Sequence, residues 1–332
     1  MDNFRKTIAV FCAISFIFTS VMATLLFNFD RRAFTAETYQ RAFAREDFYN
    51  KLPRLMAQSI ASSSADQSQF PLVMHGMSLE AWESFMHTLL PPEVLKPIGD
   101  NMLNSTFNYL SMKTNVVQVN LTPLKASMMS ETGTQAALAL IGTLPACTLE
   151  QITQITFNLF AGGQIELCNP PADMLPLLAP IIQEQMQFTA SIIPDQLTLV
   201  TAPLQNDPRE RLQTTRLFMR LSLLLPIGFL LAVTIAAIRS VKDWLNWWGI
   251  PILITGFAIF MIGILGAPVF GVVLEGILAR SLPNYLPAFL LDFTGNFASA
   301  MVRALLNPLL WQGLILAFIG GGMTGIGYFT RE

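Results

Sequence analysis

Charged residues are scarce in this sequence. Only 13% of its 332 residues are charged and 52% are hydrophobic, with a mean hydropathy of +0.49. Soluble domains carry about 25% charged residues, so the composition excludes an ordinary soluble protein. The formal net charge of −2 gives no overall excess of positive charge, and we therefore expect no nucleic-acid partner.

Motifs of catalysis and cofactor binding are also missing. The chain has no GxGxxG, Walker A, HExxH or GxSxG pattern, which would mark dinucleotide, phosphate, zinc-peptidase or serine-hydrolase sites. No nucleophile and base stand at a recognisable spacing. We therefore predict no catalytic residues and no cofactor, and we expect that the protein is not an enzyme.

Histidine is nearly absent, with only His75 and His87. Each follows a methionine, in "MHGM" at 74–77 and "MH" at 86–87, and this pair of residue types suits copper(I). With 16 methionines in the chain, the pairing is unremarkable. A helix over residues 78–90 would hold His87 about 15 Å from Met77, too far to share a metal. No metal site is predicted.

Four long stretches lack charge altogether, and about 20 apolar residues in a helix cross a bilayer core. The first is 21 residues long, whereas the apolar part of a signal peptide has about 7–15 residues. A cleaved signal peptide, with Arg5 and Lys6 before it and "VMA" at 21–23, remains the alternative. The predicted transmembrane helices are residues 7–27, 217–238, 249–274 and 306–329.

The positive charges flanking these spans predict the orientation, because Lys and Arg in short flanks stay in the cytoplasm. Arg280 and Arg303 lie on one side of the membrane. The larger group on the other side is Arg5, Lys6, Arg239, Lys242 and Arg331. We therefore predict a plasma-membrane protein with both termini in the cytoplasm. The cytoplasmic N-terminal segment would be residues 1–6, and the 239–248 loop would also be cytoplasmic. Residues 28–216 and 275–305 would lie outside.

Six arginines near the outer ends of the first two spans oppose this orientation. We interpret them as a solvated collar at the level of the lipid head groups. They are Arg31, Arg32, Arg209, Arg211, Arg216 and Arg220.

Only three cysteines occur, and none belongs to a CxxC pair. Cys12 lies within the first span, while Cys147 and Cys168 are 21 residues apart in the large outer segment. Zinc sites and redox pairs use short spacings, whereas two cysteines outside the cytoplasm usually pair. We predict a disulfide between Cys147 and Cys168. Two buried free thiols in a cytosolic domain are the alternative.

The 28–216 segment has the length of one domain and is acidic in its body. From Asp66 to Asp207 there are 12 acidic and three basic residues. This charge pattern is typical of a solvated surface, and the sharper hypothesis is an acidic face that meets a cationic partner.

Helix patterns dominate this segment, so we predict a mostly α-helical (α+β) domain with a small sheet. Thr148 and Gln151 form a capping box for a helix that reaches about Phe160. A further helix is predicted over 91–110, and an amphipathic stripe over 181–193 predicts another helix with Pro176 or Pro180 near its start. From Pro208 a single helix of 31 residues should run to Ile238, kinked at Pro226. The predicted strands are residues 115–121, 164–168 and 196–201.

The spans carry small residues in place of ionisable ones, which argues against an ion-coupled carrier. Small residues four apart allow helices to pack closely. The helix-packing residues that we predict are Gly263, Ala267 and Gly271 in the third span and Gly321 and Gly325 in the fourth. We favour packing within one bundle, with a homo-oligomer as the alternative.

The outer connection before the fourth span has helical apolar periodicity over 285–305. Its apolar face is Leu286, Phe289, Leu290, Phe293, Phe297, Met301 and Leu305. Such a helix would lie on the membrane or cover the base of the outer domain, and we favour the second.

Several short stretches between the first and second spans resemble those of a known group of proteins. These are "ETYQRAFAREDFYNKLPRLMAQSI", "VNLTPLK", "PACTLEQ" with "CNPP", and "IIPDQLTL". They are similar to a group of uncharacterised multi-pass membrane proteins of Chloroflexi-type bacteria. The resemblance supports the topology and the cysteine pair, and implies no activity.

Two functions follow as hypotheses. The first is a protein anchored in the lipid bilayer whose outer domain serves binding or assembly with a protein partner. The alternative is a membrane subunit that transmits conformation or force, since the topology is that of mechanotransmission-type ABC permeases. Only six residues precede the first span, which leaves no room for a cytoplasmic coupling helix.

Overall fold

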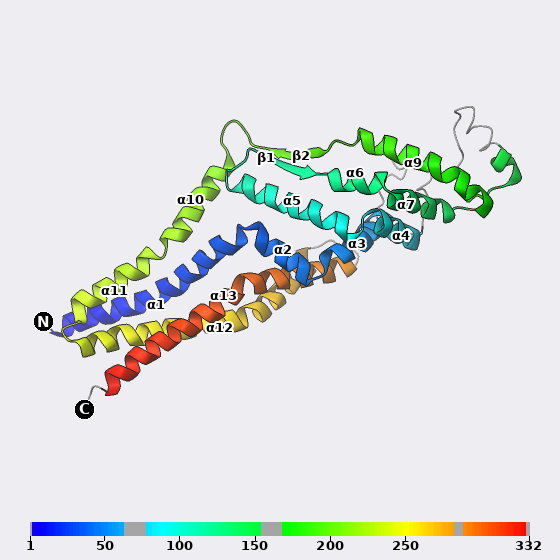
Figure 1. The fold of residues 1–332 in the computed structure, drawn as a ribbon. Helices are drawn as coiled ribbons and strands as arrows, with labels where there is room; N and C mark the ends of the chain where they lie inside the picture. The colour runs from blue at the N-terminus through cyan, green and yellow to red at the C-terminus, as the bar shows by residue number, and fades with distance from the viewer. Residues whose placement is uncertain (1, 63–77, 154–167, 282–287, 330–332) are drawn as a thin grey trace. The chain divides into compact units, whose positions relative to one another are not determined.

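The computed structural model of this chain describes residues 2–62, 78–153, 168–281 and 288–329 (Figure 1). It is mostly helical and divides into two compact units. The first unit comprises Met1–Glu46, Phe107–Lys113 and Ala202–Glu332, and the second comprises Asp47–Thr106 and Thr114–Thr201.

The first unit is built from long apolar helices. Its elements are α1 (Asp2–Ala33), α2 (Ala36–Arg45), α10 (Pro208–Leu221), α11 (Leu224–Ala237), α12 (Val241–Ser281) and α13 (Ala288–Phe329). The structure has four stretches long and apolar enough to cross a membrane: Phe4–Ala33, Pro208–Ala237, Val241–Phe270 and Gly295–Phe329. Helix α1 packs against α11, α12 and α13, and α12 packs along α13. Ile259 of α12 and Leu309 of α13 are fully buried.

The predicted 31-residue helix is divided in two. Helix α10 ends at Leu221 and α11 begins at Leu224, two residues before Pro226. Because Pro226 has no N–H to donate to the carbonyl of Ser222, that carbonyl accepts from the backbone N–H of Leu225 instead, at 3.2 Å. The proline therefore interrupts the helix four residues upstream of itself, and the prediction of one unbroken helix was wrong.

The predicted outer connection and fourth span form one helix, α13, that continues through Pro308. Residues 275–281 belong to the end of α12, and residues 282–287 lie outside the described residues. The prediction of a separate connecting helix over 285–305 is therefore corrected. Phe297 stacks on Phe43 of α2 at 5.0 Å between ring centroids, so this part of α13 packs on a segment that follows α1.

The second unit is a small helical domain with one two-stranded sheet. Its helices are α3 (Phe48–Ser62), α4 (Leu79–Leu89), α5 (Pro92–Leu110), α6 (Thr122–Met129), α7 (Glu131–Gly142) and α9 (Leu175–Ile192). The last turn of α5 belongs to the first unit. The core lies between α3, α4 and α7, and consists of Ala57, Trp82, Phe85, Met86, Ala136 and Leu140.

Strands β1 (Val116–Asn120) and β2 (Gln196–Thr201) pair antiparallel. Val117 lies opposite Val200 and Asn120 opposite Gln196, with an irregularity after Val117. Val117 and Val119 are buried, as expected for alternate residues of a half-covered strand. Both strands were predicted from the sequence and are confirmed. The third predicted strand, residues 164–168, falls outside the described residues except for Cys168.

Candidate functional site

A disulfide joins Cys147 and Cys168, as predicted. Two backbone hydrogen bonds flank the disulfide. The N–H of Cys147 donates to the carbonyl of Asn169, and the N–H of Asn169 donates to the carbonyl of Pro145. The two ends of the intervening loop are thus held side by side. Residues 154–167 of this loop, with the end of the predicted helix, lie outside the described residues.

The predicted capping box next to the disulfide is confirmed. The N–H of Gln151 donates to the Thr148 hydroxyl at 3.3 Å, and the N–H of Thr148 donates to the Gln151 side-chain oxygen at 3.0 Å. A capping box satisfies two N–H groups at the start of a helix. It therefore sets the start of the helix that follows Cys147.

One edge of the sheet is closed by side chains of α5. The N–H of Gln118 donates to the hydroxyl of Ser105 at 2.8 Å, and the N–H of Asn120 donates to the side-chain oxygen of Asn101 at 3.1 Å. Strand β1 therefore has partners on both sides, β2 on one and α5 on the other.

Strand β2 is open, in contrast. All six of its residues are exposed, and Leu197, Leu199 and Val200 each show about 45% of their surface. No residue that the structure describes pairs with its outer edge. Its start is held by Asp195, whose carbonyl accepts from the N–H of Leu121 and whose carboxylate pairs with Lys125. An ordered, exposed strand with a free edge is a surface on which another chain can add a strand.

The second unit carries a strong excess of negative charge. Its sequence holds 12 acidic residues against four basic ones, Lys51, Arg54, Lys96 and Lys125. Two of the basic residues form ion pairs there, Arg54 with Glu83 and Lys125 with Asp195. The free edge of β2 is thus part of a unit whose formal net charge is negative.

A buried ion cluster joins α1 to α10 in the first unit. Asp30 is 1% exposed and accepts a hydrogen bond from Nε of Arg216 and another from Nε of Arg220, each at 2.7 Å. The Arg216 guanidinium also lies over the ring of Phe34, 4.7 Å from its centroid. One carboxylate therefore holds two arginines one helical turn apart on α10.

The start of α10 is held in a similar way. Asp207 caps the helix through the N–H of Arg209 at 2.9 Å and also accepts from the Arg209 side chain. That side-chain hydrogen bond lowers the pKa of Asp207 below its ordinary value. Arg209 in turn donates to the carbonyl of Tyr109 at 3.1 Å, and Gln213 donates to that of Leu110 at 2.9 Å. Carbonyls at the end of α5 have no partner within their own helix. The Arg209 and Gln213 side chains supply partners to two of them, and the Tyr109 carbonyl also accepts from the backbone N–H of Met112.

The predicted solvated collar is therefore wrong for two of its six arginines. The side chains of Arg209 and Arg216 are 5% and 9% exposed and are paired with carboxylates. Arg31, Arg211 and Arg220 are exposed. The sequence separation between Asp30 and its two partners hid the pairing.

A seam of glycines brings α12 and α13 into close contact. A Cβ atom at Gly256 would clash with the backbone of Ala317, one at Gly313 would lie 2.5 Å from the backbone nitrogen of Phe260, and one at Gly263 would lie 2.7 Å from Leu310. The seam consists of Gly249, Gly256 and Gly263 on α12 and Gly313, Gly320 and Gly327 on α13. On each helix the glycines are seven residues apart, the period of a left-handed helix pair.

The glycine prediction was thus right at one position and wrong in its period. Gly263 belongs to the seam, but a Cβ at Gly325 would meet no atom within 4 Å, and one at Gly321 would make only an ordinary contact with Leu253. Ala267 is half-buried on α12, and the side-chain surroundings of position 271 are outside the described residues. The seven-residue spacing is present in the sequence, but the prediction rested on a four-residue spacing.

A polar pair links α1 to α13 and was missed entirely. Asn28 donates to the side-chain oxygen of Gln312 at 2.7 Å, and Gln312 donates back at 3.3 Å. Reciprocal amide bonds of this kind hold helices together where water is excluded. Asn28 and Gln312 carry no charge, so the pattern of charged residues in the sequence does not indicate them.

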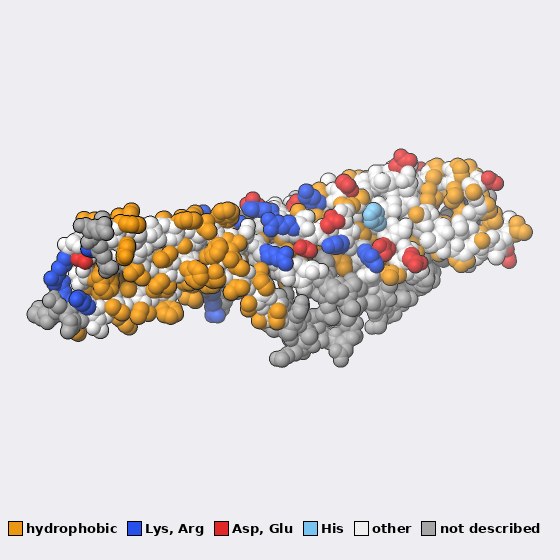
Figure 2. Space-filling model, turned by 90° about the horizontal axis from the view of Figure 1, so that it is seen from below, with side chains coloured by type: hydrophobic (Ala, Val, Ile, Leu, Met, Phe, Trp, Pro, Cys, Tyr) orange, Lys and Arg blue, Asp and Glu red, His pale blue; other side chains and the backbone are white. Residues whose placement is uncertain are grey.

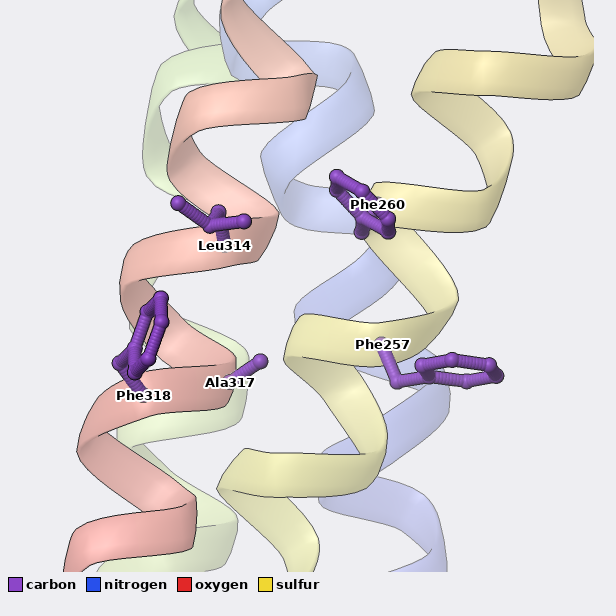
Figure 3. Close-up of a pocket in the computed structure, with 5 residues that line it drawn as sticks. All are labelled: Phe257, Phe260, Leu314, Ala317 and Phe318. Atoms are coloured by element: carbon purple, nitrogen blue, oxygen red, sulfur yellow. The ribbon is translucent and has the colours of Figure 1, made fainter.

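Apolar grooves lie between the described helices of the first unit. One, of about 270 Å³, lies between α12 and α13, and Figure 3 shows the five side chains around it: Phe257, Phe260, Leu314, Ala317 and Phe318. Another, of about 280 Å³, lies between α1 and α12; we call it the α1–α12 groove. It is lined by Val10, Ala13, Ile14, Ile17, Asn246, Trp247, Ile250, Pro251 and Ile254.

Among the residues that the structure describes, no three His, Cys, Asp or Glu side chains gather in a way that would hold a metal ion. His75 lies outside the described residues, and His87 is exposed near the end of α4.

Comparisons with protein-family models, with curated proteins and with solved structures find no match to this chain. The resemblance to Chloroflexi-type membrane proteins thus stays a prediction from the sequence.

Proposed function

We propose that this chain is a multi-pass plasma-membrane protein whose second unit lies outside the cytoplasm and binds a basic, extended segment of a partner protein. The observation that carries the proposal is the exposed strand β2, with its free edge in a unit of negative net charge.

Membrane embedding is supported by the surface of the apolar helices. Phe11, Phe18 and Phe318 are 68%, 70% and 72% exposed, and Figure 2 shows apolar side chains covering much of this surface. A continuous apolar surface of this kind is unfavourable in water, but it is solvated by lipid tails.

The disulfide supports an extracytoplasmic second unit. Thiols in the cytoplasm are kept reduced, whereas disulfides persist outside it. With the positive flanks of the spans, this favours cytoplasmic termini and an outer second unit.

The mode of binding follows from the geometry of β2. A partner strand would form main-chain hydrogen bonds to the free edge, and its apolar side chains would pack on Leu197, Leu199 and Val200. Basic residues on the partner would be attracted by the negative charge of the unit, which raises the rate of association.

The binding proposal is tested by photo-crosslinking in intact cells, with a photoreactive amino acid in place of Val200. We expect a crosslink to one protein, mapped by mass spectrometry to a segment rich in Lys and Arg. Leu197→Lys should lower the crosslink about tenfold by like-charge repulsion, while Leu197→Glu should keep it. Leu204→Lys is the matched control, since Leu204 is fully exposed outside β2. Equal crosslinking by the Lys and Glu variants, or an acidic segment, would refute the proposal.

The orientation is tested separately by labelling with a membrane-impermeant maleimide. In a Cys12→Ala background, Cys147 and Cys168 should label in intact cells only after an impermeant reductant is added. Ser240→Cys, in the turn between α11 and α12, should label only in broken cells. The reverse pattern would place the second unit in the cytoplasm.

One observation favours the second candidate function, the transmission of conformational change. Helix α10 is held by the ion pairs of Arg209 and Arg216, whereas α11 is apolar. The break at Ser222 and Leu223 lies between these two helices and would act as a hinge. Co-purification of the intact chain with an ATPase would favour this function over the first.

A further inference from the structure

The α1–α12 groove has a regular apolar wall on each side. Val10, Ala13, Ile14 and Ile17 follow each other at helical spacing on α1, and Asn246, Ile250 and Ile254 do so on α12. Ile14 and Ile254 remain 49% and 45% exposed. The α1 wall is about 10 Å long, so the groove fits a slender apolar chain.

A lysine stands one helical turn before each wall. Lys6 precedes Val10 by four residues, and Lys242 precedes Asn246 by four residues. Residues four apart lie on the same face of a helix, so both lysines lie in line with the groove.

The two lysines lie at the same end of the unit. Nη2 of Arg5 donates to the carbonyl of Ile235 in the last turn of α11 at 3.4 Å, and α12 begins at Val241. Figure 2 shows Lys and Arg side chains gathered at this end. Of the side chains described there, Asp243 is acidic, and it lies beside Lys242 in the first turn of α12.

Three tryptophans near the start of α12 indicate that this end of the unit lies at the membrane–water interface. Trp247 lines the groove, and Trp244 lies 5.4 Å from Trp248 between ring centroids. Tryptophan is enriched where lipid head groups meet the hydrocarbon core. The amide side chain of Asn246 lies on the groove wall, one helical turn after Lys242 in α12.

We propose that the α1–α12 groove binds an acyl chain of an anionic phospholipid, whose phosphate is held by Lys6 and Lys242. The inference rests on the membrane embedding proposed above. In the proposed orientation the groove opens to the cytoplasmic leaflet, where anionic lipids attract basic residues. The groove of Figure 3 has no Lys or Arg one turn from its lining residues, and it serves as an internal contrast.

Native mass spectrometry of the full chain in detergent tests the proposal, with palmitoyl-oleoyl phosphatidylglycerol and phosphatidylcholine as probes. At low lipid concentration we expect one bound phosphatidylglycerol, with an affinity about tenfold above that for phosphatidylcholine. Ile14→Trp fills the groove and should abolish this first binding event. Ile315→Trp is the matched control, since Ile315 is similarly exposed on α13 outside the groove.

A second pair of variants tests the head group without altering the apolar walls. Lys6→Gln with Lys242→Gln should make the two lipids bind equally, whereas Lys96→Gln with Lys113→Gln should keep the preference. The lysine variants decide the question even where Ile14→Trp does not fold. Equal affinities in the wild-type chain, or an undiminished preference in the Lys6 and Lys242 variant, would overturn the proposal. Loss of membrane embedding would instead appear as release of the wild-type chain by alkaline carbonate.

Discussion

Asp30 and Arg216 lie 186 positions apart in the chain and form an ion pair of 2.7 Å in the interior of the first unit. The Asp30 side chain is 1% exposed and that of Arg216 is 9% exposed, whereas the second partner of Asp30, Arg220, is 54% exposed. The two pairs share one carboxylate but differ in their contact with solvent.

This difference predicts unequal effects of substitution. Asp30→Asn leaves Arg216 buried without its counter-charge, which costs about 3–5 kcal/mol. Arg220→Gln removes an exposed partner and should cost about 0–1 kcal/mol. Unfolding of the purified chain in mixed micelles measures both effects. Equal losses in the two variants would show that the cluster is not buried in the way the structure describes.

The disulfide should contribute to the stability of the second unit. In the chain-entropy model, closing a loop between cysteines 21 residues apart contributes about 3.4 kcal/mol. Cys147→Ser combined with Cys168→Ser should therefore lower the denaturation midpoint of this unit, and reductant should do the same to the wild-type chain. Cys12→Ala is the control and should leave the response to reductant unchanged. A wild-type midpoint insensitive to reductant would contradict the prediction.

The glycine seam predicts that alanine acts differently at glycines inside and outside it. Gly256→Ala forces a methyl group against the backbone of α13, and overpacking of this kind costs about 1–3 kcal/mol. Gly325→Ala has open space at the same helix pair and should be neutral or slightly stabilising, because alanine favours the helix. Thermal unfolding in detergent compares the two variants. Equal destabilisation by both would argue against the seam.

Asp207 predicts a loss of stability in acid. Its pKa is lowered in the folded state by the hydrogen bond from Arg209, so folding favours the carboxylate. The stabilisation is fully present above the unfolded pKa of about 3.9 and is lost as the pH falls through the folded pKa. Asp207→Asn keeps a good helix cap but has no proton to bind. The variant should therefore show a weaker fall in stability below about pH 4 than the wild-type chain does, measured as the unfolding midpoint against pH.

Local features of the fold were predictable from short stretches of sequence. The capping box of Thr148 and Gln151, the start of α10 at Asp207 and Pro208, and both strands of the sheet depend on neighbouring residues and are present. The cysteine pair was also predictable, because composition and spacing left few alternatives. An irregularity of the helix at Pro226 was expected, but the interruption lies upstream at Ser222 and Leu223. It lies there because a proline leaves the carbonyl four residues before it without its helical partner.

Features that depend on distant residues were not predictable. Nothing near Arg216 in the sequence indicates Asp30, and nothing near Gln312 indicates Asn28. The glycines of α12 and α13 face each other only because the two helices pack along most of their length. Likewise, the closed edge of β1 depends on Ser105 and Asn101 of α5, which precede the strand by more than ten residues.

The sequence by itself determined the class of this protein, because long runs without charge form helices that only lipid or a protein interior can solvate. It also determined where the helices after Thr148 and Asp207 begin, since caps and prolines act on adjacent backbone groups. Only the tertiary structure decided which arginines are buried, which glycines touch, which strand edge stays open and where lysines flank a groove. These properties depend on which faces of the elements meet, and such contacts join residues far apart in the chain.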